Sequence, residues 1–163
     1  MNQEVEESNL DDIEQEFGAC VNHGIDTGFL VAAEVVEHAN HQAARAKIAA
    51  FVAAGDGFAL APQVLAEFIH VVTDGKRFTA PLSVDAARDL AQKWWTAQEV
   101  IRVIPGEAAV AQFFDWHRTH GLGRKRILDT LLAATYRSAG INSILTTDAK
   151  DFAGLGGFQC VEP

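Results

Sequence analysis

The sequence predicts a single α/β domain in which helices cover both faces of a mainly parallel sheet. Three observations predict this fold class. Short aliphatic and β-branched runs alternate with helical patterns along the chain, as in βαβ units. The length of 163 residues suits one domain with a substantial core. Two of the strand-like runs end within two residues of an acidic residue, Asp26 or Asp148, at the edge where parallel sheets place their ligands.

The first strand is expected at residues 19–25, an apolar run that ends at Asp26. The next apolar side chains recur at the spacing of one helical face. They are Phe29, Leu30, Ala33 and Val36. An Ala-rich helix is then expected at 42–54, because Gly55 follows as a C-terminal cap.

A second strand is expected at 57–61, and Pro62 suits the first turn of the helix that follows it. Glu67 falls between the apolar residues of that helix. After a surface loop at 75–82, Ser83 is a fitting N-cap for a helix at 84–98. The alternation continues with a strand at 99–104, a helix at 107–117 and a loop at 119–123.

The next helix is expected to begin near Arg126 and to end at the cap Gly140. Its apolar face has the i, i+3, i+4, i+7 spacing. The face consists of Leu128, Leu131, Leu132 and Thr135. A buried strand at 141–146 leads into an acidic loop that begins at Asp148, and residues 158–161 can supply an edge strand.

The net charge of −9 is concentrated at the amino terminus. Residues 1–22 contain seven acidic residues and no Lys or Arg, which leaves 15 acidic and 13 basic residues in the rest. We therefore interpret residues 1–17 as an acidic, disordered or loosely helical extension and 18–163 as the folded domain. The nearly neutral domain does not exclude a nucleic-acid partner.

Localisation is expected to be cytoplasmic, with no membrane association. No apolar run approaches the roughly 18 residues of a membrane span, and the acidic start is unlike a signal peptide. Cys20 and Cys160 lie in strand-like stretches without metal-ligand spacing, so we expect reduced, buried thiols.

Three acidic residues are expected at one rim of the sheet: Asp26 and Asp148 at strand ends, and Asp129 in the first turn of a helix. Each alone has an ordinary explanation as a helix-terminal or turn residue. Together they would repel by about 4 kcal/mol per pair at 4 Å and a dielectric near 20, unless a cation intervenes. Carboxylate oxygens of this kind select Mg²⁺ or Mn²⁺.

Four segments resemble the PIN-domain ribonucleases, and among them the toxin subunits of bacterial toxin–antitoxin pairs. The segments are IDTGFL, LAEF, RILDTLLAATYRSAG and ILTTDAKDF, which contain Asp26, Glu67, Asp129 and Asp148 respectively. The resemblance implies a five-stranded Rossmann-like sheet, divalent metal at these four acids, and cleavage of single-stranded or looped RNA. It also implies an antitoxin partner and a homodimer.

In such a site Asp26, Asp129 and Asp148 would hold metal, and Glu67 would orient the attacking water or hold a second ion. We expect the basic run Arg124, Lys125 and Arg126 to bind substrate phosphates, since it directly precedes the Asp129 helix. Thr146 matches the family's hydroxyl residue and is a further candidate for substrate binding. Gly28 departs from the family, which usually has Asn or Ser there.

Other functions are less well supported. An aspartyl-phosphate phosphatase would need an acid at position 28, which is glycine. The pairs His38/His41 and His117/His120 have zinc-like spacing but no third ligand at a fixed spacing. Three tryptophans could stack on bases, although core contacts are favoured. The serious alternative is a catalytically inert PIN-like binding or assembly module.

Overall fold

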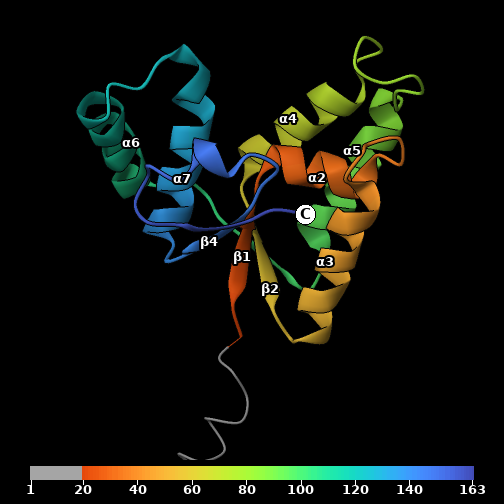
Figure 1. The fold of residues 1–163 in the computed structure, drawn as a ribbon, viewed down its shortest axis with the longest axis horizontal. Coiled ribbons are helices and arrows are strands. Elements are labelled where there is room, and N and C mark those ends of the chain that lie inside the picture. Colours follow the sequence, from red (N-terminus) through yellow and green to blue (C-terminus); the bar gives the residue numbers. More distant parts are fainter. Residues whose placement is uncertain (1–19) are drawn as a thin grey trace, which may run out of the picture.

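The computed structural model describes residues 20–163 and shows one parallel sheet with helices on both faces (Figure 1). The five strands lie in the order β3-β2-β1-β4-β5, and every neighbouring pair is parallel. They are β1 (Asn22–Ile25), β2 (Gly57–Leu60), β3 (Val100–Arg102), β4 (Ser143–Leu145) and β5 (Gln159–Val161). The predicted α/β fold with five strands is confirmed, although all five strands are shorter than the runs that predicted them.

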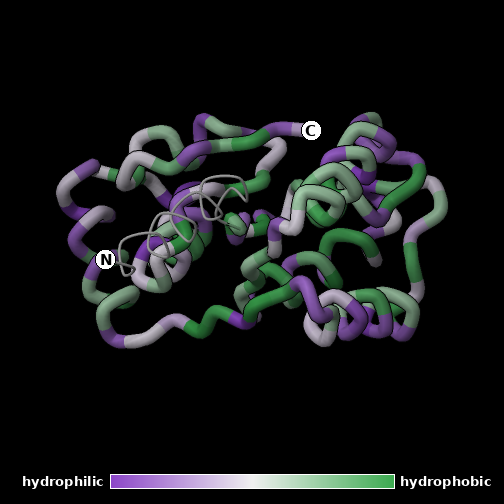
Figure 2. Tube along the Cα trace, turned by 90° about the horizontal axis from the view of Figure 1, so that it is seen from below, coloured by the Kyte–Doolittle hydropathy of each residue, from purple (hydrophilic) through white to green (hydrophobic). Residues whose placement is uncertain are grey.

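Six α-helices connect the strands. They are α2 (Thr27–Glu34), α3 (His41–Ala53), α4 (Pro62–Val72), α5 (Val84–Thr96), α6 (Glu107–Thr119) and α7 (Ile127–Ser138). In Figure 1, α6 and α7 lie on one side of the sheet and α2–α5 on the other. Two 3₁₀ turns, η1 (Arg124–Arg126) and η2 (Ala149–Asp151), flank the start of α7 and the end of β4. Figure 2 shows hydrophilic and hydrophobic residues alternating along the helical coils, as expected where helices cover a sheet. Helix α2 differs, because six of its eight residues are buried.

The sequence features that were expected to limit the helices do so. Ser83 Oγ accepts a hydrogen bond of 3.2 Å from the Ala86 amide at the start of α5. Gly55 and Gly140, which follow the C-cap residues of α3 and α7, have positive φ values of 83° and 76°, a conformation that side chains disfavour. Pro62 occupies the first turn of α4.

A buried tyrosine fixes the end of the central strand β1. The Tyr136 hydroxyl donates a hydrogen bond of 2.7 Å to the Ile25 carbonyl, and burial raises the pKa of this phenol. The ring lies so close to Gly24 that an added Cβ would be 2.7 Å from Cδ2 of Tyr136. The glycine therefore lets α7 pack directly on β1, immediately before Asp26.

The cysteine prediction is partly wrong. Both cysteines are free, but Cys20 is exposed and Cys160 is only partly buried. The reason is that β1 begins at Asn22, so that Cys20 precedes the sheet instead of forming part of it. The three tryptophans, Trp94, Trp95 and Trp116, pack against the core as expected.

The predicted acidic extension at residues 1–17 lies outside the described residues. Across residues 20–163, no helix combines the length and the apolar character that crossing a bilayer requires.

Candidate active site

Acidic residues from four elements line one cavity at the carboxyl ends of β1 and β4. The cavity has a volume of about 350 Å³ and is lined in part by Asp26, Glu67, Asp129, Asp148 and Asp151. The first four are the residues that the sequence singled out, and the structure brings all of them to the same cavity. Asp151 is an additional carboxylate that the sequence showed only as part of an acidic loop.

Asp26 is held by backbone and side-chain hydrogen bonds between the two central strands. Its amide donates to the Leu145 carbonyl at 2.9 Å, and its Oδ2 accepts from the Thr146 hydroxyl at 2.9 Å. Although Asp26 occupies the N-cap position of α2, its side chain makes no capping hydrogen bond. Asp26 instead lines the acidic cavity, at the start of α2.

Thr146 is fully buried, and its hydroxyl is used twice. It donates to Asp26 and accepts from the Asp148 amide at 3.1 Å. This arrangement differs from the expected contact with substrate, because a side chain with no exposed surface positions other groups of the site. Thr146 connects the acidic residues that follow β1 and β4.

Glu67 extends from α4 and is fixed by a residue that the sequence did not single out. The Thr27 hydroxyl, in the first turn of α2, donates to Glu67 Oε2 at 2.8 Å. Thr27 directly follows Asp26, so one short segment supplies one carboxylate of the site and orients a second. Its position after a strand-end acid was a usable signal for such a role.

Asp148 combines a local role with its place in the cavity. Its Oδ1 accepts a hydrogen bond of 3.2 Å from the Lys150 amide and thereby caps η2. The ordinary interpretation of this residue as a turn former therefore holds, while its carboxylate still lines the acidic cavity.

The electrostatics of the cavity disfavour ionised carboxylates. Burial raises the pKa of Asp26 to about 6; the Thr146 hydrogen bond opposes the shift and the charge of Asp129 adds to it. Burial also raises the pKa of Asp129 to about 6, and the charge of Asp151 adds to the shift while Arg126 opposes it. Two acidic groups therefore have pKa values near the range in which catalytic sites operate.

The three residues of the basic run, Arg124 to Arg126, have different environments in the structure. Arg124 and Lys125 are exposed on η1, where they can be reached by a substrate. Arg126 instead turns toward the acids, and its Nε lies 3.5 Å from Asp151 Oδ1 and 3.9 Å from Asp129 Oδ2. Arg77 also lines the acidic cavity. No sequence pattern singles out Arg77, which lies in the loop expected at 75–82.

The donor set has the chemistry of a hard divalent cation site. All of the acidic groups around the cavity offer carboxylate oxygens, which Mg²⁺ and Mn²⁺ prefer. Within the described part of the chain, however, no three Asp, Glu, His or Cys side chains lie close enough together to share one ion. The carboxylates would have to turn toward an ion in order to bind it.

A comparison with known protein families identifies the family of this chain. The PIN domain family matches residues 25–157, which is most of the sequence. The chain belongs to the PIN-domain family. No protein with a curated function matches the sequence.

Solved structures with the same PIN fold include bacterial toxins. The Mycobacterium tuberculosis toxin VapC20, described as cleaving the sarcin–ricin loop, is 20% identical with a TM-score of 0.65; the match covers 86% of this chain and 98% of that one. VapBC2 from Rickettsia felis, bound to promoter DNA, is 13% identical with a TM-score of 0.62 and coverages of 88% and 99%. A toxin–antitoxin complex from Klebsiella pneumoniae is 14% identical with a TM-score of 0.58 and coverages of 85% and 95%.

The Gly28 departure has a structural explanation in this PIN domain. A Cβ at position 28 would collide with the Thr147 hydroxyl. Both residues line the acidic cavity. The Thr147 side chain thus occupies the space that a side chain at position 28 would need.

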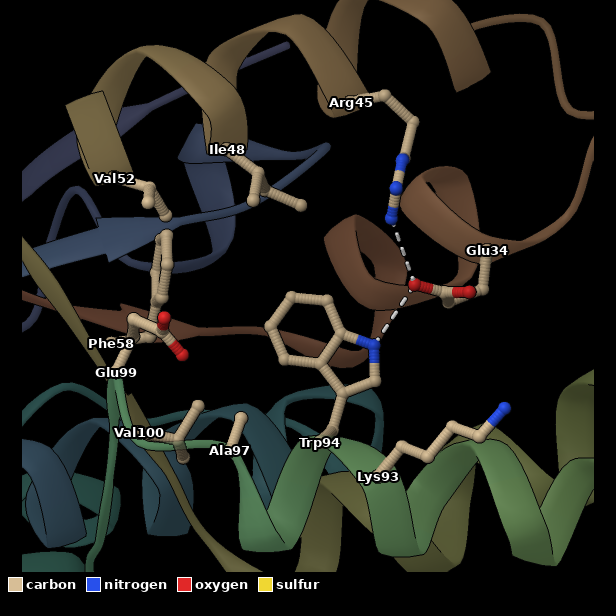
Figure 3. Close-up of a pocket in the computed structure, with 10 residues that line it drawn as sticks. All are labelled: Glu34, Arg45, Ile48, Val52, Phe58, Lys93, Trp94, Ala97, Glu99 and Val100. Carbon is tan, nitrogen blue, oxygen red and sulfur yellow. Dashed lines mark hydrogen bonds and ion pairs between the residues drawn. The ribbon is translucent and has the colours of Figure 1, made fainter.

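A second cavity of this PIN domain lies between α3 and α5 and is mainly apolar (Figure 3). Its volume is about 290 Å³. On its rim, Glu34 Oε1 accepts a hydrogen bond of 2.9 Å from the Trp94 indole and lies 3.3 Å from Arg45 (Figure 3). None of the carboxylates of the acidic cavity lines it, so we assign it no part in the chemistry.

Proposed function

We propose that this PIN domain is a Mg²⁺- or Mn²⁺-dependent ribonuclease that cleaves single-stranded or looped RNA. The observation that supports the proposal most strongly is the convergence of carboxylates from separate elements on one polar cavity. Their crowding contributes to raised pKa values at Asp26 and Asp129. A site of this composition is unfavourable without a cation, which favours a metal-dependent function over a structural one.

The roles of the residues follow from their positions. Asp26, Asp129 and Asp148 would hold the cation. A divalent cation in such a site lowers the pKa of a bound water and compensates charge on the leaving oxygen. Glu67, held by Thr27, would orient the attacking water.

The remaining residues act on geometry and on the substrate. Thr146 keeps the Asp26 carboxylate oriented through its hydrogen bond. Arg124 and Lys125, both exposed beside the start of α7, would contact phosphates of the RNA and set its position along the cavity. Looped RNA as the substrate class is supported by the VapC20 toxin, which cleaves the sarcin–ricin loop.

We further propose that the protein is the toxin of a toxin–antitoxin pair, acts in the cytoplasm and forms a homodimer. Structures with the same fold include toxin–antitoxin complexes from two species, which supports an antitoxin partner. Co-expression with the product of a neighbouring small gene, followed by co-purification, tests this part. Growth arrest that the neighbouring gene relieves is the expected result.

The alternative is a catalytically inert PIN-like module. Its acids would be structural, as the capping hydrogen bond of Asp148 is. Two observations argue against this alternative. The Asp26 side chain makes no capping hydrogen bond to α2, and the pKa values of Asp26 and Asp129 are raised. A nuclease assay with purified protein, RNA and either Mg²⁺ or EDTA separates the two: cleavage that requires the metal supports the enzyme, and no cleavage of any RNA supports the module.

A further inference from the structure

One arginine connects the two segments that carry most of the site's acids. Arg126 is the last residue of η1, and its guanidinium lies between α7 and the loop that follows β4. Its Nε is 3.9 Å from Asp129 Oδ2 and 3.5 Å from Asp151 Oδ1. One of its terminal nitrogens also donates to the Lys150 carbonyl at 3.4 Å. A single side chain thus contacts one residue of α7 and two of the loop.

The environment of Arg126 is unlike that of a surface ion pair. Its side chain is 26% exposed, compared with 59–60% for Arg77 and Arg88, which form ion pairs elsewhere. Its Nε is buried and has no hydrogen-bond partner among the described residues. A buried cationic nitrogen without a hydrogen bond is stabilised chiefly by nearby negative charge.

The charge balance of the cavity points to the same role. Five carboxylates line it, and among the ion pairs of residues 20–163 only those of Arg126 involve any of these five. The exposed neighbours Arg124 and Lys125 make no such contact. Arg77 also lines the cavity, but its ion pair is with Asp74, which does not. Among residues 20–163, Arg126 is therefore the cation that is ion-paired with the cavity's carboxylates.

We propose that Arg126 is the resident counterion of the acidic cavity: a positioning residue that bridges Asp129 and Asp151, ties the loop after β4 to α7, and opposes divalent metal by its charge. The proposal rests on the metal-dependent function proposed above. It assigns Arg126 a role different from phosphate binding, and it assigns Asp151 a role in the site through Arg126.

Two opposite consequences follow from removal of the guanidinium. When no metal is bound, the guanidinium no longer offsets the repulsion between the acidic residues, so the metal-free variant is less stable than the metal-free wild type. With Mg²⁺, the site has one positive charge fewer to compete with the ion. A unit charge near a divalent ion changes its affinity by roughly tenfold even in a water-like dielectric.

The experiment compares four proteins: wild type, Arg126→Gln, Arg126→Lys and the control Arg118→Gln. The control removes the same group from an exposed position on α6. Melting temperatures are measured in EDTA, and Mg²⁺ dissociation constants by calorimetry. We expect Arg126→Gln to melt several degrees lower than the control in EDTA and to bind Mg²⁺ about tenfold more tightly than wild type.

Arg126→Lys keeps the charge but has no planar fork to reach both carboxylates. It should restore the wild-type Mg²⁺ affinity and only part of the stability. Equal melting of Arg126→Gln and the control in EDTA would overturn the proposal, as would unchanged or weaker Mg²⁺ binding by Arg126→Gln. If wild type binds no Mg²⁺, the proposed function fails, whereas the melting comparison in EDTA still decides whether Arg126 bridges the acids.

Discussion

The Thr146 hydroxyl donates a hydrogen bond of 2.9 Å to Oδ2 of Asp26, a residue 120 positions earlier in the sequence. This bond joins the ends of two adjacent strands, β1 and β4, and it opposes the rise in the pKa of Asp26 that burial causes. The same hydroxyl accepts from the Asp148 amide. A fully buried threonine thus controls both the orientation and the ionisation of the site.

Replacing Thr146 with Val removes this hydroxyl and keeps the shape of the side chain. We expect the pKa of Asp26 to rise above about 6, so that Mg²⁺ binding at pH 7 weakens several-fold and recovers at higher pH. Calorimetric titrations between pH 6 and 9 measure the shift. Thr146→Ser, which keeps the hydroxyl, is the control and should behave like wild type. A Val variant with an unmoved pH profile would show that the hydrogen bond does not tune Asp26.

Asp129→Asn should stabilise the metal-free protein at neutral pH by about 1 kcal/mol, because it removes a charge that burial and Asp151 disfavour. With Mg²⁺ the order should reverse, because the ion stabilises wild type more than the variant. Wild type should gain roughly 2.7 kcal/mol at a hundred times its Kd, and the variant much less. Melting curves with EDTA and with Mg²⁺ provide both numbers. An Asn variant that is less stable without metal and shifts as much with metal would identify Asp129 as a simple helix-start anion.

The pH dependence of stability follows from the two raised pKa values. Asp26 and Asp129 have pKa values of about 6 in the folded protein, above the usual value near 4 in an unfolded chain. The folded state therefore binds more protons between these values, and its stability falls as pH rises through about 6. For Asp26 the effect is on the order of 2–3 kcal/mol. Urea unfolding in EDTA from pH 4.5 to 7.5 measures it, and Asp26→Asn should flatten the decline.

Mg²⁺ should reverse this trend, because it binds only the ionised carboxylates. We expect little stabilisation by the ion at pH 5 and the full effect at pH 7.5. Equal stabilisation by Mg²⁺ at both pH values would place the ion away from Asp26 and Asp129.

The proposed phosphate contacts can be tested through salt. Replacing both Arg124 and Lys125 with Ala should weaken binding of single-stranded RNA and reduce the slope of log K against log salt by about 1.4, since each phosphate contact contributes about 0.7. Mg²⁺ affinity should change little, because both residues are exposed and neither forms an ion pair with the cavity's acids. Fluorescence anisotropy in EDTA, over a range of salt concentrations, measures the slope. An unchanged slope would place the RNA elsewhere.

Most of the fold could be predicted because its signals are local. Strand-length apolar runs, the caps at Ser83, Gly55 and Gly140, and Pro62 each act within a few residues. The acids Asp26 and Asp148 could be placed for the same reason, since the carboxyl ends of parallel strands share one edge. The error at Cys20 arose because apolar character alone does not show where pairing with a neighbouring strand begins.

The parts of the site that depend on side-chain direction could not be predicted. Thr27 reaches Glu67 across 40 residues, and no local pattern encodes that contact. Arg126 resembles its neighbours in sequence but turns inward, toward Asp129 and Asp151. Its i, i+3 spacing to Asp129 was compatible with an ion pair, yet only the packing of the loop after β4 against α7 distinguishes it from Lys125.

The central claim is that the carboxylates of the acidic cavity hold a divalent cation for RNA cleavage. The most direct measurement is cleavage of a single-stranded or stem-loop RNA by purified wild type, Asp26→Asn and Asp129→Asn, each with Mg²⁺ and with excess EDTA. The account predicts cleavage by wild type with Mg²⁺ alone, and a loss of at least a hundredfold in either variant. Cleavage that persists in EDTA, or in both variants at the wild-type rate, would contradict it.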